Sequence, residues 1–310
     1  MSNPTRGIFS AASSPRGCGR RRGHGGGLRG VRGFAGQPTR GRGRGREIVA
    51  DGRANERAQL RAISHETKAV IPDQKWCPKF SGTKIQVLDA DTFDAGIRLL
   101  SDSNGDNNQS GSPVTDVTVL NMASDFVPGG GWLSGARAQE EALCRRSTLT
   151  ASLKRYFYPT PSSAVIYSPA VIVFRNNLKD GHGLMDLSDP DTLPLVSVIS
   201  MAALRRPEVI NGANSLMKFA NPNDRDRTKE KMRVILRLSA WKRYRKLVLG
   251  ALGNPPEEVA NCGAEVFSEP EFRGGWWEKV VFAVIDETGL GEQGHGNVGI
   301  FFRRLDGIEI

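Results

Sequence analysis

The amino-acid sequence predicts a three-layer α/β/α domain with a largely parallel or mixed sheet. The first observation is a set of near-continuous runs of valine, isoleucine and leucine, which indicate strands that are buried on both faces. The second is that helical patterns separate several of these runs. The third is size, because a chain of 310 residues with 38% hydrophobic side chains can form one such domain preceded by a tail.

Six strand-like runs follow one another along the chain. They are KIQVL (84–88), DVTVLNMA (116–123), SAVIYSPAVIVF (163–174), LVSVIS (195–200), KLVLGAL (246–252) and KVVFAVID (279–286). Apolar residues at helical spacing predict a first helix around Leu60 and Ile63, and further helices over 138–156 and 227–245. Asp91, followed by Thr92, has the sequence of a helix N-terminal cap, which predicts a short helix after the first strand.

Charge is distributed very unevenly. Residues 1–46 hold eleven arginines and no lysine, aspartate or glutamate, so this segment alone carries a charge of +11. The remaining residues hold 32 basic and 33 acidic side chains, a net charge of −1. The overall charge of +10 therefore reflects the first segment, and it does not indicate that the folded part binds nucleic acid.

Glycine and arginine dominate residues 1–46, which offer few apolar side chains to bury, so we expect a disordered tail. Its eight Arg-Gly dipeptides are typical of segments that bind RNA, DNA or other polyphosphates through charge and guanidinium stacking. Two other interpretations stay open, a solubilising tail without a partner and a mitochondrial presequence, although its glycine density disfavours the amphipathic helix of a presequence. The Arg-Gly content favours the nucleus or cytoplasm over an organelle.

The cysteine pattern and the hydropathy exclude several classes of protein. Cys18, Cys77, Cys144 and Cys262 are widely scattered and form no Cys-x-x-Cys pair, which argues against a disulfide framework and against a zinc site. No apolar run approaches the roughly 18 residues of a membrane helix, and no signal-peptide pattern opens the chain. We therefore expect a soluble intracellular protein that is monomeric and has no membrane partner.

The segment PGGGWLSGARAQEE (128–141) places three glycines between a predicted strand and a predicted helix. Glycines at such a position let the backbone approach a phosphate group, whose charge is met by free N–H groups and by the helix dipole. The P-loop does not fit, because Ala136 follows Gly135 where a lysine is needed. The dinucleotide fingerprint does not fit either, because Ser134 stands where it needs glycine. We therefore expect neither nucleoside triphosphate hydrolysis nor NAD-dependent redox chemistry.

Two adjacent glutamates, Glu140 and Glu141, come at the start of the predicted helix. Neighbouring helical side chains point about 100° apart, so the two carboxylates cannot both address one atom. One interpretation is a division of labour, with one carboxylate at a reacting bond and the other on a neighbouring hydroxyl group. The alternative is that both only complement the helix dipole in its first turn.

With these residues in view, the chain resembles the microbial-type poly(ADP-ribose) glycohydrolases. Their signature is three glycines, six to eight residues and then Gln-Glu-Glu, and this chain has Gly129-Gly130-Gly131, seven residues and Gln139-Glu140-Glu141. The resemblance covers roughly residues 53–286. Further segments similar to the family follow in the family's order, namely IYSPAVIVFR (166–175), VSVISMAA (196–203), KMRVILRLSAWKRYRKLVLGA (231–251), NPPEEVA (254–260) and VVFAVID (280–286).

The resemblance implies a macrodomain-like catalytic domain over residues 47–310 that acts on poly(ADP-ribose) or on ADP-ribosylated proteins. It implies hydrolysis of ribose–ribose O-glycosidic bonds with release of ADP-ribose, and no cofactor or metal. By position, Glu141 would be the catalytic acid that protonates the leaving ribose oxygen and then assists water. Because a helix N-terminus favours an ionised glutamate, we expect Glu141 to be protonated mainly when the substrate's diphosphate is bound.

The same resemblance assigns substrate contacts to the residues around Glu141. Glu140, the second member of the catalytic pair, and Asn121 would hold ribose hydroxyl groups. The three glycines Gly129, Gly130 and Gly131 would lie against the scissile ribose and the diphosphate, and Gln139 would shape the turn.

The chain departs from the family after KLVLGAL. The family usually continues with a second glycine-rich loop of the type Gly-Cys-Gly-Ala-Phe before Asn-Pro-Pro, whereas this chain runs directly from Gly253 into Asn254. About five residues are missing, which leaves Gly250, Ala251 and Gly253 as the remaining substrate contacts. Losing two charge-assisted hydrogen bonds would weaken binding by about 3–6 kcal/mol.

Two explanations of the short loop stay open, a genuine shortening that weakens or abolishes activity, and a mis-spliced gene prediction. They lead to two hypotheses of function. The first is a poly(ADP-ribose) hydrolase with Glu141 as its essential residue. The second is a non-catalytic ADP-ribose or nucleic-acid binding module whose Arg-Gly tail supplies affinity.

Other conspicuous residues have simpler interpretations. Trp276 and Trp277 precede a predicted strand, so packing or an exposed apolar rim is favoured over a base-stacking platform. His182 and His295 lie in glycine-rich stretches without an acid or cysteine at ligand spacing, so we expect them to be solvated loop residues.

Overall fold

The structure is a computed structural model that describes residues 74–102, 115–212 and 216–310. The expected tail over residues 1–46, the boundary at residue 47, Cys18 and the predicted helix around Leu60 lie outside these ranges and stay predictions. None of the helices in the described part of the chain has the length and hydropathy of a membrane span.

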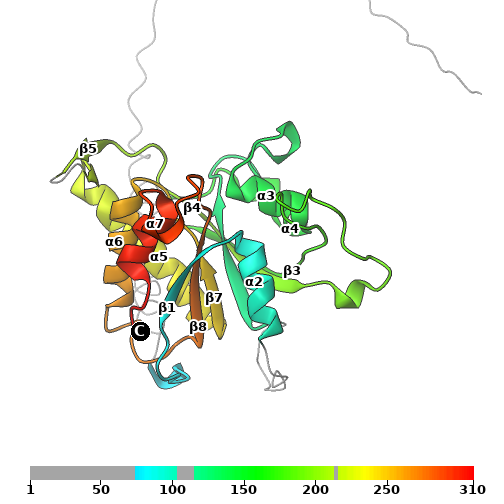
Figure 1. Ribbon diagram of the computed structural model, residues 1–310, viewed down its shortest axis with the longest axis horizontal. Coiled ribbons are helices and arrows are strands. Elements are labelled where there is room, and N and C mark those ends of the chain that lie inside the picture. Colours follow the sequence, from blue (N-terminus) through cyan, green and yellow to red (C-terminus); the bar gives the residue numbers. More distant parts are fainter. Residues whose placement is uncertain (1–73, 103–114, 213–215) are drawn as a thin grey trace, which may run out of the picture. The chain divides into compact units, whose positions relative to one another are not determined.

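A six-stranded sheet forms the middle layer of the described region (Figure 1). Its strands are β1 (Ile85–Asp89), β2 (Val117–Ala123), β3 (Val165–Ile172), β4 (Leu195–Ala202), β7 (Lys246–Leu249) and β8 (Lys279–Val284). All six predicted strands are therefore confirmed. They lie side by side in the order β1-β8-β7-β2-β4-β3.

The sheet is mixed. Five of its strands run parallel, and β3 pairs antiparallel with β4 at one edge. In the parallel pair of β2 and β4, Asn121 lies opposite Ser200 near the carboxyl ends. Because the carboxyl ends of parallel strands meet at one edge of a sheet, this edge is where ligands of such folds bind.

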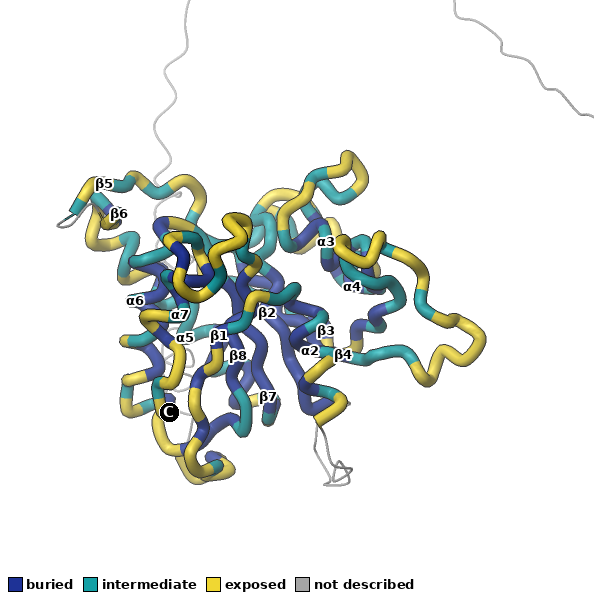
Figure 2. The backbone as a smooth tube through the Cα atoms, in the orientation of Figure 1, coloured by how far each residue is buried: buried dark blue, intermediate teal, exposed yellow. Residues whose placement is uncertain are grey.

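Helices cover both faces of the sheet, which confirms the three predicted layers (Figure 1). One face carries α2 (Thr92–Ser101), α3 (Gln139–Arg146) and α4 (Leu149–Ser152), and the other carries α5 (Pro222–Trp241), α6 (Pro256–Phe267) and α7 (Asn297–Leu305). Each helical layer packs on the sheet through its own hydrophobic core, the first core under α2, α3 and α4 and the second core under α5, α6 and α7. Side chains alternate along β8, with Val281 in the first core and Val280 and Phe282 in the second core. Figure 2 shows the strands buried between the two helical layers.

Several short elements were not predicted from the sequence. A small antiparallel hairpin joins β5 (Val209–Asn211) to β6 (Met217–Phe219). Single 3₁₀ turns are η1 (Gln74–Trp76), η2 (Trp132–Ser134), η3 (Arg155–Phe157), η4 (Pro190–Thr192) and η6 (Gly291–Gln293). Elements of three residues are too short to give a recognisable hydrophobic period.

The prediction of one helix over 138–156 is wrong in its length. The first helix, α3, ends at Arg146, and the backbone is extended at Ser147, with φ −149° and ψ 176°. Ser147 pairs with Val173 in an isolated bridge, and its hydroxyl group donates to the carbonyl of Leu143 at 2.8 Å. Backbone pairing with the segment after β3 therefore overrides the helical spacing, and the chain continues through α4 and η3.

The other predicted helices are present with different bounds. The helix predicted over 227–245 begins earlier, where the side chain of Asn221 accepts from the backbone of Asn223 at 3.0 Å. It ends at Trp241, and Arg243 has a positive φ of 60°. The predicted cap of α2 is confirmed, because Asp91 accepts from the backbone N–H of Phe93 at 2.8 Å. Neither α6 nor α7 was predicted from periodicity.

The two adjacent tryptophans are core residues, as favoured from the sequence. Trp276 and Trp277 are 4% and 0% exposed, and their indole N–H groups donate to the carbonyl of Glu271 and to the hydroxyl of Ser239. Three cysteines of the described region, Cys77, Cys144 and Cys262, are buried free thiols.

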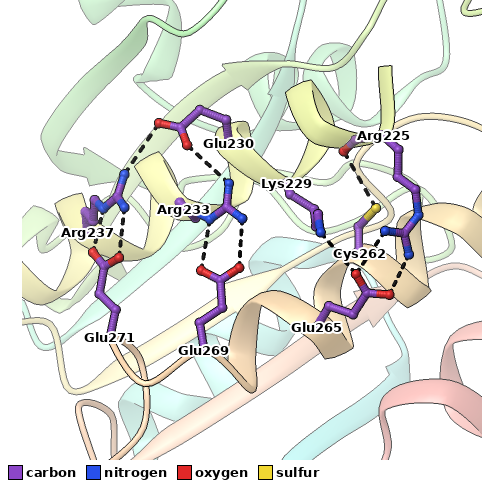
Figure 3. Close-up of polar contacts among 9 residues, drawn as sticks. All are labelled: Arg225, Lys229, Glu230, Arg233, Arg237, Cys262, Glu265, Glu269 and Glu271. Carbon is purple, nitrogen blue, oxygen red and sulfur yellow. Dashed lines mark hydrogen bonds and ion pairs between the residues drawn. The ribbon is translucent and has the colours of Figure 1, made fainter. Parts of the chain in front are cut away.

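Ion pairs join α5 to α6 and to the segment that follows α6 (Figure 3). They connect Arg225 and Lys229 to Glu265, Arg233 to Glu269, and Arg237 to Glu271, with Glu230 between the last two arginines. These side chains are partly exposed, so each pair adds about 1 kcal/mol or less. Their combined effect is to fix the direction of α5 against the second core.

Arg146 connects α3 to α2. Its side chain is 1% exposed and forms ion pairs with Asp91 and, at 2.5 Å, with Asp94. Its Nε also donates to the carbonyl of Arg175 at 3.2 Å. The last residue of α3 therefore anchors that helix to the N-terminal end of α2.

Replacing Arg146 with methionine would leave the carboxylates of Asp91 and Asp94 without their buried cation. We expect the free energy of unfolding to fall by about 3 kcal/mol, measured by urea titration with tryptophan fluorescence. The matched control is Arg227→Met, which breaks an exposed pair with Asp224 and costs less than about 1 kcal/mol. Equal losses in the two variants would contradict the anchoring role.

Candidate active site

The glycine-rich segment lies between the carboxyl end of β2 and the first turn of α3, as predicted. The site residues inferred from the sequence lie in β2, in this segment and in the connection after β7, and hydrogen bonds join Asn121 of β2 to Glu140 and Gly131 to Glu141. The helix begins directly at Gln139, so Glu140 and Glu141 occupy its first turn. The connection therefore combines a close backbone approach with two carboxyl groups.

Gln139 holds the junction of three elements together. Its side-chain oxygen accepts from the backbone N–H of Met122 at 2.8 Å. Its side-chain nitrogen donates to the carbonyl of Leu120 at 2.7 Å and to the hydroxyl of Thr92 at 3.0 Å. Gln139 therefore fixes the start of α3 against the end of β2 and the start of α2.

Glu140 is buried at 3% exposure, and both of its oxygens accept hydrogen bonds from the end of β2. One oxygen accepts from the backbone N–H of Ser124 at 2.7 Å, and the other from the side chain of Asn121 at 3.4 Å. Burial raises the pKa of Glu140 from 4.5 to about 7, and the neighbouring charge of Glu141 adds to the rise. Hydrogen bonds from Ser124 and Asn121 oppose this rise in pKa.

Glu141 lies against the glycines. Its side chain is buried, and one oxygen accepts from the backbone N–H of Gly131 at 2.9 Å. The other oxygen is buried and has no hydrogen-bond partner within the described part of the protein. The two glutamates therefore have separate partners, as their directions on the helix predicted, and their contacts go beyond the helix dipole.

Gly130 must lack a side chain. Its φ is +56°, and a Cβ there would lie 2.3 Å from the carboxylate oxygen of Glu141 and 3.2 Å from that of Glu140. Gly129 also has a positive φ, of +70°, and a Cβ on it would lie 3.0 Å from the sulfur of Cys144. The glycines thus let the backbone pass directly over the two acids.

Asn121 completes this side of the site. It is fully buried and donates to the hydroxyl of Ser200 at 3.0 Å in addition to Glu140. Its amide oxygen is buried without a hydrogen-bond partner among the described residues. Buried polar atoms without partners are rare in proteins, and near the two acids the described residues include three, on Asn121, Glu141 and Tyr158.

The short connection after β7 lies at the same edge of the sheet. A Cβ on Gly250 would lie 3.3 Å from the side chain of Met122, next to the Gln139 junction. Gly253 has a φ of +95°, and its N–H donates to the carbonyl of Ala251 at 2.8 Å. A Cβ on Gly253 would lie 3.0 Å from Ala203, just beyond β4. The connection thus lies against Met122 of β2 and against Ala203, just beyond β4.

Three residues near the acids were not identified from the sequence. Ser124 supplies the backbone N–H that binds Glu140. Burial raises the pKa of Cys144 to about 12, with the negative charges of Glu140 and Glu141 contributing to the rise. Burial and Glu140 also raise the pKa of Tyr158, whose buried hydroxyl lacks a partner within the described ranges. Ser124 follows a predicted strand end and could have been inferred, whereas nothing in the sequence connects Tyr158 to this site.

The two histidines lie elsewhere. His182 is partly buried in a turn, with Nδ1 3.2 Å from the carbonyl of Asn176, and His295 is exposed. Within the described ranges, no three His, Cys, Asp or Glu side chains gather as a metal site.

Fold and site together define an α/β/α domain in which glycine backbone without side chains and two buried carboxyl groups meet beyond the carboxyl end of β2. The family model of the microbial-type PARG catalytic domain matches residues 44–176. Crystal structures of bacterial poly(ADP-ribose) glycohydrolase (PARG) are also similar. The chain belongs to this family of microbial-type poly(ADP-ribose) glycohydrolases.

Three of these similar structures illustrate the match. The Thermomonospora curvata enzyme bound to the inhibitor ADP-HPD is 32% identical with a TM-score of 0.56, and the match covers 72% of this chain and 80% of that one. Another structure of the same enzyme is 30% identical with a TM-score of 0.58, covering 76% and 82%. The Deinococcus radiodurans enzyme in complex with ADP-ribose is 29% identical with a TM-score of 0.56, covering 74% and 87%. No curated protein sequence matches the chain significantly.

The close approach of Glu141 to Gly130 predicts the effect of adding a methyl group. Gly130→Ala would push its Cβ into the carboxylate, and we expect it to lower the free energy of unfolding by about 1–3 kcal/mol more than Gly135→Ala does. Gly135 is the matched control, because it also has a positive φ, of +84°, but nothing lies within 4 Å of its added Cβ. Urea unfolding measures both variants, and equal losses would contradict the contact.

The raised pKa of Glu140 predicts a pH dependence of stability. A carboxyl group whose folded pKa exceeds its unfolded pKa stabilises the fold below the unfolded value, and this contribution is lost as pH rises through the folded value. For Glu140 the window runs from 4.5 to about 7. We expect the stability of the wild type relative to Glu140→Gln to fall by up to about 3 kcal/mol across it. Urea unfolding at pH 5 and pH 8 measures this difference, and a constant difference would refute the prediction.

Proposed function

We propose that this chain hydrolyses ribose–ribose O-glycosidic bonds in poly(ADP-ribose) and releases ADP-ribose, with Glu141 as its acid and base. The observation that carries the proposal is the Glu141 carboxyl group. One oxygen is held by the N–H of Gly131, and the other is buried beside the glycines without a protein partner in the described region. That second oxygen is the position from which a proton can pass to a bound substrate.

The proposed chemistry follows from a single positioned carboxyl group. Protonated Glu141 would donate its proton to the leaving ribose oxygen while positive charge develops at the anomeric carbon. The carboxylate that results would then accept a proton from the water that attacks that carbon. Gly129, Gly130 and Gly131 would support the scissile ribose and the diphosphate, because backbone without side chains lets the ligand approach closely.

Glu140 and Asn121 have a different part in the proposal. Glu140 is already bound to Ser124 and Asn121, which leaves it poorly placed to reach the same atom as Glu141. We assign both residues to the ribose hydroxyl groups, with the unpartnered amide oxygen of Asn121 as one acceptor.

Paired amide variants test the assignment. We expect Glu141→Gln to lower kcat on poly(ADP-ribose) by about 10²- to 10⁴-fold while ADP-ribose still binds, because the amide keeps the shape and cannot transfer the proton. The isosteric control Glu140→Gln should retain more turnover and change mainly KM. Turnover unchanged by Glu141→Gln, or abolished by Glu140→Gln alone, would overturn the assignment.

A second candidate function is a binding module without turnover. The observation that favours it is the short connection from Gly250 to Asn254, which lacks about five residues that the resemblance leads us to expect. Sequencing the transcript across codons 250–256 establishes whether the shortening is genuine. Calorimetry with ADP-ribose beside a turnover assay then separates the two functions, because binding without turnover selects the module.

A further inference from the structure

A polar cavity of about 360 Å³ lies beside the segment that leads into Gly129. Its walls come from Asp125, residues 160–162, residues 202–208 and the first turns of α5. We call this cavity the basic pocket, because its lining includes four cationic side chains, Arg205, Arg206, Arg227 and Lys231.

The acidic lining does not neutralise these cations. Asp224 pairs with Arg227 at 3.2 Å, and Glu208 is exposed at the rim. Burial, and after it the neighbouring charge of Arg227, lower the pKa of Lys231, and the charge of Asp125 opposes this fall. Even so, among the described residues no carboxylate lies within ion-pair distance of Lys231.

Lys231 is the residue that indicates a ligand. It is 3% exposed, and its ammonium group donates to the backbone carbonyl of Ser162. Arg227 donates to the hydroxyl of the same serine at 3.3 Å, so the two cations converge on one wall of the basic pocket. A buried ammonium group without a carboxylate partner costs free energy that a bound anion would offset.

The basic pocket adjoins the active site through the loop after β2. Ser124 binds Glu140 through its N–H at 2.7 Å, and the next residue, Asp125, lines the basic pocket. Arg205 stacks over the ring of Phe126 at 4.5 Å, three residues before Gly129. The loop that leads from β2 to the glycines therefore borders Glu140 at Ser124 and the basic pocket at Asp125.

We propose that the basic pocket binds the diphosphate of the ADP-ribose unit on the leaving side of the scissile bond. A diphosphate suits the site because it carries negative charge and several acceptor oxygens. The arginine side chains of the basic pocket and the buried Lys231 can bind these oxygens together. The inference rests on the proposed function, which supplies the polymer. The basic pocket would make the protein bind poly(ADP-ribose) more tightly than single ADP-ribose units.

The first experiment tests the basic pocket alone. Calorimetry with inorganic pyrophosphate, in the presence of saturating ADP-ribose, should detect a site in the full chain whose affinity depends on Lys231, beside any binding to the arginines of residues 1–46. We expect Lys231→Met to weaken this site by about tenfold to a hundredfold and Arg227→Gln to weaken it less. The control Lys229→Met removes the same charge from the same helix, but Lys229 faces Glu265 of α6 at 3.2 Å (Figure 3) and should leave binding unchanged.

The second experiment tests the polymer as the source of the diphosphate. In the Glu141→Gln background, an ADP-ribose dimer should bind more tightly than ADP-ribose, and Lys231→Met and Arg227→Gln should remove that gain. Pyrophosphate binding without any gain for the dimer would assign the basic pocket to free phosphates and overturn the proposal. No pyrophosphate site, or equal affinities in all variants, would also overturn it. If Lys231→Met fails to fold, Arg227→Gln decides the result.

The proposed function can fail separately. Wild-type protein that binds pyrophosphate in the basic pocket but leaves poly(ADP-ribose) uncut would refute the hydrolase and keep the anion site. If the wild type cuts the polymer and both pocket variants, Lys231→Met and Arg227→Gln, have the same kcat/KM as the wild type, the hydrolase stands and the role of the basic pocket is refuted.

Discussion

The side chain of Gln139 makes the junction on which the rest of the site depends. Its three hydrogen bonds join the end of β2, the start of α2 and the first turn of α3. Once the first helical residue is fixed, helix geometry sends the next two side chains in different directions. Glu140 therefore lies against Ser124, and Glu141 lies against Gly131. Arg146 fixes the other end of the same helix to α2, so the positions of both acids follow from a short helix that is held at both ends.

Burial then gives the two acids different properties. Glu140 is buried beside the end of β2, and the lost hydration raises its pKa to about 7 although hydrogen bonds from Ser124, Asn121 and Gly129 oppose the rise. Glu141 instead lies under backbone that has no side chains, and one of its oxygens has no partner in the described region. Two neighbouring residues of one type can thus serve different purposes, because the backbone directs them into different surroundings.

The sequence predicted the layers, the six strands and the position of the glycines and acids between β2 and α3, because these follow from hydrophobic period and from the order of these residues in the chain. It failed where tertiary contacts decide the outcome. Ser147 leaves the helical path because its backbone pairs with Val173, a contact 26 residues along the chain. Tyr158 and the basic pocket could not be predicted, since Lys231 and Ser162 approach each other only through folding. The raised pKa of Glu140 also depends on burial, which the sequence position of the residue does not contain.

We infer that an ADP-ribose unit binds with its ribose beside Glu141 and its diphosphate against the glycines. A crystal structure of the full chain with ADP-ribose measures this most directly. We expect the anomeric carbon and its hydroxyl group next to the unpartnered oxygen of Glu141, and the diphosphate along Gly129, Gly130 and Gly131. ADP-ribose bound away from the carboxyl end of β2, or bound there with its ribose turned away from Glu141, would contradict the account.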